Sequence, residues 1–220
     1  MVEADGSIPG MRRWRGRSPA DRVAARREQL IDACTELMAT VGAAETSMRG
    51  VCRQAGLTER YFYESFPNLD ALLTTVLDTV VLGARDRLLA ELPGAPAERG
   101  AMFRHMVGVF TDYLVADRRR GRIMFVESQA TPVLMPRAGE LIGLFTGPIA
   151  MIVGAGDYAD PPPDDFDNAL NASAIFGALA YLYRPWLDGA IPIPRERFDE
   201  HAAHVIERIA TARSTAHTEA

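Results

Sequence analysis

The sequence predicts an all-α protein. Apolar residues recur at the helical spacing of three and four positions, and no segment of the 220 residues shows the alternation of a strand. Hydrophobic residues make up 48% of the chain and charged residues 24%, which is the balance of a folded globular protein. We expect a small helical domain at residues 18–67 and a larger one at residues 68–220, behind a flexible basic arm at residues 1–17.

The small domain opens with two helices whose ends are marked by the sequence. The first begins after Ser18 and ends near Gly42. The second is short and is capped by Ser47, because a serine oxygen can accept a hydrogen bond from the first turn of a helix. Gly56 ends it, since glycine takes the left-handed conformation without strain.

A third helix follows at once from Thr58, and Leu57 and Phe62 have the spacing of a hydrophobic staple that fixes its entry angle. Two short capped helices joined by a tight glycine turn indicate a helix-turn-helix, whose second helix places its early residues in the major groove of DNA. Arg60 is suited to two hydrogen bonds with guanine. A generic three-helix cluster inside a larger bundle is the alternative. The candidate DNA-binding residues are Ser47, Arg49, Thr58, Glu59, Arg60, Tyr61 and Tyr63.

Charge is unevenly placed along the chain. The net charge is −5, yet residues 1–60 hold ten arginines and eight acidic residues, whereas the rest holds fourteen and twenty-one. The basic character therefore lies at the N-terminal end. The run MRRWRGR in residues 1–17 could enter a minor groove beside a major-groove reader, and a solvated tail is the alternative.

The larger domain begins with a long helix that follows Asn68 and keeps its apolar period as far as the LPG motif at residues 92–94. The longest apolar stretch, residues 141–156, is shorter than the roughly 20 residues of a membrane-spanning helix and contains Pro148. We therefore expect no membrane partner. Further helices are expected over about residues 96–116, 118–129, 136–153, 164–187 and 195–211.

No pattern indicates a catalytic residue, a metal site or a bound cofactor. The G-x-G-x-x-A of residues 151–159 is followed by DPPPDD, whereas a dinucleotide-binding turn must open a helix. His201 and His204 lack an H-E-x-x-H pattern and fit a solvated helix face. Cys34 and Cys52 fit core thiols in a reducing cytoplasm, which is the location that we expect.

Aromatic and methionine residues are frequent after Gly100 and could line an apolar pocket, since ligand pockets are largely apolar with a few polar groups. A plain hydrophobic core is the alternative. Met124, Met151, Phe176 and Trp186 belong to this set, and His105 is a further polar candidate. The predicted ligand-binding residues are Met102, Phe103, Met106, Phe110, Tyr113, Phe125, Glu127, Phe145 and Tyr181.

The segment ETSMRGVCRQAGLTERYFYESFPNLDALL, residues 45–73, resembles the DNA-binding region of TetR-family transcriptional regulators, and the specific match covers about residues 20–75. The resemblance implies a homodimer that binds a pseudo-palindromic DNA operator and is most often a repressor. It also implies a small-molecule effector, bound after Gly100, that shifts the helix beginning at Asn68. The small-residue run at residues 169–182 lies where this family usually pairs two subunits.

Three residues depart from the family pattern. Leu69 stands where a lysine is usual, Ser65 where a histidine is common, and Arg60 where a small residue is frequent. Anchoring on phosphates is therefore expected to be weaker or to lie elsewhere. An activator of the same family, a helical ligand-binding protein without a DNA function and a non-specific architectural DNA binder are the alternatives.

Overall fold

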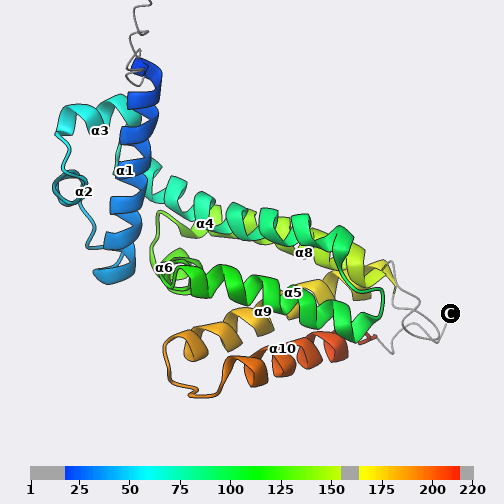
Figure 1. The fold of residues 1–220 in the computed structure, drawn as a ribbon. Coiled ribbons are helices and arrows are strands. Elements are labelled where there is room, and N and C mark those ends of the chain that lie inside the picture. The colour runs from blue at the N-terminus through cyan, green and yellow to red at the C-terminus, as the bar shows by residue number, and fades with distance from the viewer. Residues whose placement is uncertain (1–17, 155–163, 214–220) are drawn as a thin grey trace, which may run out of the picture.

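The computed structural model describes residues 18–154 and 164–213, and every regular element in these ranges is helical (Figure 1). The N-terminal unit consists of α1 (Pro19–Thr40), α2 (Met48–Ala55) and α3 (Glu59–Ser65). The other elements are α4 (Leu69–Glu91), a 3-10 turn (Leu92–Gly94), α5 (Arg99–Ala116), α6 (Arg119–Arg122), a π-helix (Ile123–Glu127), α7 (Ser128–Ala130), α8 (Met135–Gly154), α9 (Asp165–Leu187) and α10 (Arg195–Ile209). The predicted all-α class is confirmed, whereas the predicted basic arm at 1–17 lies outside the described residues.

Local hydrogen bonds explain where the N-terminal helices begin and end. Ser18 and Asp21 form a capping box, with the Asp21 N–H donating to Ser18 Oγ at 3.0 Å. Ser47 Oγ accepts from the Gly50 N–H at 3.1 Å, and Gly56 has φ +65°. Thr58 occupies the predicted N-cap position of α3, but its side chain makes no capping hydrogen bond.

The helix α4 joins the N-terminal unit to the rest of the protein. Asn68 caps it, with Oδ1 accepting from the Ala71 N–H at 2.8 Å. Figure 1 shows α4 leaving the unit of α1, α2 and α3 and running along the larger unit beside α8. Leu72 and Leu77 are both fully buried. One helix therefore carries apolar side chains into the core of both units.

The larger unit is a layered helical bundle. The helix α5 packs between α4 and α10, and α8 packs against α9 (Figure 1). Tyr183 of α9 is fully buried at the centre, where its ring lies 5.1 Å from the ring of Phe110 and 4.8 Å from that of Phe198. Its hydroxyl oxygen lies 2.7 Å from Thr111 Oγ1, so a buried polar group is satisfied within an aromatic core.

The helical stretch expected at residues 118–129 is divided. The structure forms α6, then five residues of π-helix, then α7. A side chain at Gly121 of α6 would collide with Leu187 Cδ1 of α9 unless that leucine shifted. This part of the chain is thus shaped by its contact with α9 as well as by its own helix propensity.

No single helix in the described ranges is both long and apolar enough to cross a membrane. Taken together, the segments Glu59–Ser65 and Leu69–Gly94 meet this criterion of length and apolar composition, but they are bent by 60° relative to each other.

Candidate DNA-binding surface and ligand cavity

The first residues of α3 form an exposed polar surface. Thr58, Glu59 and Arg60 are all exposed, with 85% of the Arg60 side chain accessible, and Tyr63 is 59% exposed. Phe62, between them, is fully buried and packs 6.1 Å from Phe66, ring centre to ring centre. The buried phenylalanines therefore fix α3 on its unit and leave the neighbouring side chains free to meet DNA.

Both exposed arginines of this surface are held by glutamates. Arg49 Nε of α2 lies 3.1 Å from Glu59 Oε1, and Arg60 Nε lies 3.1 Å from Glu64 Oε1. Ion pairs as exposed as these contribute only about 0–1 kcal/mol, so DNA bases or phosphates can replace the glutamates at low cost. The pairs hold the guanidinium groups near α3 before DNA arrives.

The two other predicted DNA-binding side chains have structural contacts of their own. Ser47 Oγ is engaged as the N-cap of α2. The Tyr61 ring is half-buried beneath Arg26, whose guanidinium carbon lies 4.3 Å from the ring centre. Arg26 Nη2 also lies 3.4 Å from Glu64 Oε2. The Tyr61 ring can therefore reach DNA only together with Arg26 or after Arg26 moves aside.

Two arginines of α1 supply cations that sequence reasoning missed. Arg26 covers Tyr61, and Arg27 covers Phe66 with its guanidinium carbon 4.8 Å from the ring centre. Ser65 and Leu69, which replace a histidine and a lysine of the family pattern, bring no positive charge; Ser65 Oγ is buried without a hydrogen-bond partner among the described residues. Nothing in the sequence of α1 indicates which of its arginines face α3.

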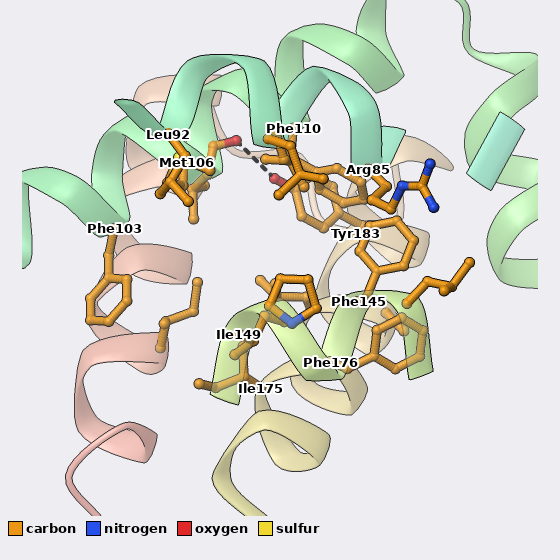
Figure 2. Close-up of a pocket in the computed structure, with 18 of the residues that line it drawn as sticks. Arg85, Leu92, Phe103, Met106, Phe110, Phe145, Ile149, Ile175, Phe176 and Tyr183 are labelled. Atoms are coloured by element: carbon orange, nitrogen blue, oxygen red, sulfur yellow. Dashed lines mark hydrogen bonds between the residues drawn. The ribbon is translucent and has the colours of Figure 1, made fainter. Parts of the chain in front are cut away.

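An apolar cavity of about 140 Å³ lies inside the larger unit (Figure 2). Side chains from α4, α5, the π-helix, α8, α9 and α10 surround it. Arg85 is the one charged residue among the described lining residues, and its guanidinium is bound to the carboxylate of Asp86. Tyr183 also lines the cavity, but its hydroxyl oxygen lies 3.3 Å from the Val107 carbonyl oxygen (Figure 2) and 2.7 Å from Thr111 Oγ1, so it is already paired. The cavity therefore suits an apolar molecule or an apolar part of one.

The structure brings six of the nine predicted ligand-binding residues to this cavity, together with two further members of the aromatic and methionine set. The six are Met102, Phe103, Met106, Phe110, Phe125 and Phe145, and the further two are Met124 and Phe176. Leu88, Leu92, Ile149, Ile175, Leu179 and Tyr183 also line it and were missed. They come from segments whose apolar residues fit a plain core equally well.

Three predicted ligand-binding residues lie away from this cavity. Tyr113 points toward α4 and donates to the Val80 carbonyl at 2.8 Å. Tyr181 is 79% exposed on the outer face of α9. Glu127 is buried on the side of the π-helix that faces the N-terminal unit. His105 and Trp186 do not line the cavity either, and nothing is described of the Met151 side chain.

Comparisons with known proteins agree with this geometry. Residues 30–76 match the family of bacterial regulatory proteins called the tetR family, and these residues span the second half of α1, all of α2 and α3, and the start of α4. Residues 30–76 thus carry the N-terminal region of the tetR family. The match includes the exposed surface of α3, so that surface corresponds to the family's helix-turn-helix. No curated protein matches the sequence.

Solved structures share the fold over most of the chain. The fatty acid degradation regulator FadR from Bacillus halodurans has a TM-score of 0.69 at 15% identity, covering 90% of this chain and 97% of its own. FadR from Bacillus subtilis, solved with stearoyl-CoA, has a TM-score of 0.69 at 16% identity, covering 84% and 97%. A TetR-like regulator from Rhodococcus sp. RHA1 has a TM-score of 0.64 at 18% identity, covering 85% and 94%.

The match assigns residues 30–76 to the tetR family of bacterial regulatory proteins, and the solved structures show that the rest of the chain shares the fold of such regulators. FadR from Bacillus subtilis was solved with stearoyl-CoA, and the multidrug binding protein EbrR was solved with imidazole. No group of three or more histidine, cysteine or acidic side chains within the described ranges is arranged to hold a metal ion.

Proposed function

We propose that the protein is a homodimeric repressor that leaves a pseudo-palindromic operator when an apolar effector fills the cavity. The observation that carries this proposal is the double role of α4. Arg85, Leu88 and Leu89 near its end line the cavity, while Leu72 near its start is buried beneath the N-terminal unit. A rigid helix that contacts both places moves the DNA-binding unit when the cavity changes volume.

The effector that the cavity supports is a long apolar chain. The lining is aliphatic and aromatic, and Met102, Met106 and Met124 can change rotamer to enlarge it. FadR from Bacillus subtilis was solved with stearoyl-CoA, which carries an acyl chain of this type. We therefore propose an acyl group, free or as a thioester, as the first effector to test.

The dimer is proposed to form through α8 and α9. On α9, Phe166 is 83% exposed, Leu170 is 65% exposed and Tyr181 is exposed as well, although all three are large apolar or aromatic side chains. Ile142 of α8 is also exposed. Exposed apolar side chains on both helices favour an interaction site here, and a two-fold axis through it would present two copies of α3 to two half-sites.

One experiment tests the DNA-binding part of this proposal. Double-stranded DNA selected from a randomised pool by the purified protein should contain an inverted repeat, and binding should weaken steeply as salt rises. Absence of any specific, salt-sensitive binding would favour a helical ligand-binding protein without a DNA function. Equal binding to all sequences would favour an architectural DNA binder.

A second experiment tests release by the effector. Stearoyl-CoA should lower operator affinity, and operator DNA should lower the affinity for stearoyl-CoA by the same factor because coupling between two sites is reciprocal. Coenzyme A without an acyl chain is the control and should change neither. An increase of operator affinity, with transcription rising on addition of stearoyl-CoA, would favour an activator.

A Leu170→Arg substitution tests the dimer. A charge in the middle of the apolar surface should give a monomer in analytical ultracentrifugation and should reduce the affinity for the full inverted repeat. Arg208→Ala on α10, outside that surface, is the matched control. An unchanged dimer after Leu170→Arg would place the interface elsewhere.

A further inference from the structure

The carboxylate of Glu127 forms a contact between the two units that the cavity alone does not explain. Its Oε2 accepts a hydrogen bond from the Ala43 backbone N–H at 2.8 Å, in the turn between α1 and α2. Its Oε1 accepts from Arg122 Nε at 3.1 Å. The side chain is only 7% exposed, although glutamate is rarely buried unless it is paired. The bond to Ala43 spans 84 residues of sequence.

The turn that receives this carboxylate is shaped for it. Gly42 has φ +97°, a conformation that favours glycine, and a Cβ on Gly42 would lie 3.5 Å from Glu127 Oε2. Thr46 Oγ1 closes the turn by donating to the Gly42 carbonyl at 2.8 Å. The first residue of α2 is Met48, so a displacement of this turn reaches the helix-turn-helix within a few residues.

Glu127 ends a five-residue π-helix whose earlier residues line the apolar cavity. Met124 and Phe125 face the cavity, and the Ser128 N–H completes the wide turn by donating to the Ile123 carbonyl. On its other side, Val126 and Arg122 line a second cleft of about 260 Å³ that α1 and α9 also border. The π-helix is therefore a wall with the effector cavity on one side and open space on the other.

We propose that this segment, with Glu127 as its positioning residue, transmits occupation of the cavity to the turn between α1 and α2. The inference rests on the proposed function, because it names how the effector acts and not what the effector is. A π-helical turn contains one residue more than an α-helical turn, and each residue of an α-helix turns by roughly 100°. A change from π to α geometry at Phe125 thus rotates Glu127 away from Ala43 without unfolding the helix.

Breaking the contact between Glu127 and Ala43 costs free energy. A carboxylate that accepts hydrogen bonds from a backbone N–H and an arginine leaves both donors unpaired when it moves. Arg122 is already 43% exposed beside the second cleft, so water can replace the carboxylate there, and the Ala43 N–H carries most of the cost. Filling the cavity therefore acts against the hydrogen bond between Glu127 and Ala43. When that bond breaks, the DNA-binding unit loses its fixed position.

The experiment is a double-substitution cycle that needs no knowledge of the natural effector. Ala180→Phe places a ring into the cavity from α9 and stands in for a ligand; Leu179→Trp is the alternative if that variant does not fold. Each is made alone and together with Glu127→Ala, which removes the acceptor of the Ala43 N–H, and affinity is measured for the DNA selected by the wild-type protein. Glu207→Ala, which removes a carboxylate paired with Arg99 within the larger unit, is the matched control.

The expected result is that filling the cavity weakens operator binding at least about tenfold in the wild-type and Glu207→Ala backgrounds but less than about threefold with Glu127→Ala, because interacting sites depart from additivity. Equal losses in all backgrounds would overturn the role of Glu127 and leave the proposed function standing. No loss in any background would instead reject the proposed coupling of cavity and operator.

Hydrogen exchange gives an independent readout with Glu127 in place. The Ala43 amide should exchange faster in the Ala180→Phe protein than in the wild type, whereas the Ala71 amide, bonded to Asn68 at the start of α4, should not change. An unchanged rate at Ala43 in a protein that has lost operator affinity would also overturn the inference.

Discussion

Replacing Arg60 tests whether its side chain contributes to base recognition or to the stability of the fold. Its side chain is exposed and has a single ion pair, with Glu64 one turn later on α3. Such pairs stabilise a helix by about 0.3–0.5 kcal/mol. Arg60 also lies in the first turn of α3, where a positive charge is unfavourable to the helix dipole, so the net effect of Arg60→Ala on unfolding should stay within about 0.5 kcal/mol.

The effect on DNA should be larger and confined to one position. A bidentate contact with guanine is worth about 1–3 kcal/mol of discrimination, which is about 5- to 150-fold in affinity. The assay is fluorescence anisotropy with the selected operator and with every single-base variant of one half-site. The Arg60→Ala protein should lose its preference at one base pair of each half-site and keep its preferences at the others.

Arg87→Ala is the matched control, since Arg87 forms the same i, i+4 ion pair with Glu91 at 3.1 Å, at the far end of α4. This variant should bind all operator variants as the wild type does. The reasoning would be refuted if Arg60→Ala reduced affinity by the same factor for every base variant, because that result describes a phosphate contact.

Three further predictions concern other side chains. Tyr63→Phe should weaken binding to all DNA sequences alike, measured by anisotropy against salt, if its exposed hydroxyl holds a phosphate; a loss at one base pair only would contradict this. Hydrogen bonds from Arg119 hold the pKa of Asp117 below its usual range, so its stabilisation is present above about pH 3.9 and is lost as the pH falls through the lower folded value. Asp117→Asn should therefore cost about 1 kcal/mol in urea unfolding at pH 7 and much less near pH 2, and a constant difference would count against the ion pair. Burial raises the pKa of Cys34 to about 12, so a thiol reagent at pH 8 should leave Cys34 unmodified by mass spectrometry until urea unfolds the protein.

The helix-turn-helix could be recognised in the sequence because its signals act over three or four residues. Ser47 caps its helix through the amide of Gly50, and Asn68 does so through the amide of Ala71. The left-handed turn at Gly56 needs only the absence of a side chain. Interactions of this range depend only on residues a few positions apart in the sequence. The helices from α1 to α4 therefore begin close to where the pattern places them.

The helix α9 shows where sequence reasoning stops. Tyr181 and Tyr183 are two positions apart in one apolar helix, yet Tyr181 is exposed and Tyr183 is at the centre of the core. Two residues along an α-helix differ by roughly 200°, so they point to opposite sides. When a helix is apolar all round, its period does not show which side packs inward.

The sequence by itself therefore determined the helical class and the capped ends of the helix-turn-helix, because local geometry decides them. Only the tertiary structure decided that Arg26 covers Tyr61, that six of the nine predicted residues share a cavity, and that Glu127 bonds to the turn at Ala43. Each of these contacts joins segments that lie far apart in the chain. Their pairing depends on how whole helices pack against one another, and the residues of one helix do not specify its neighbour.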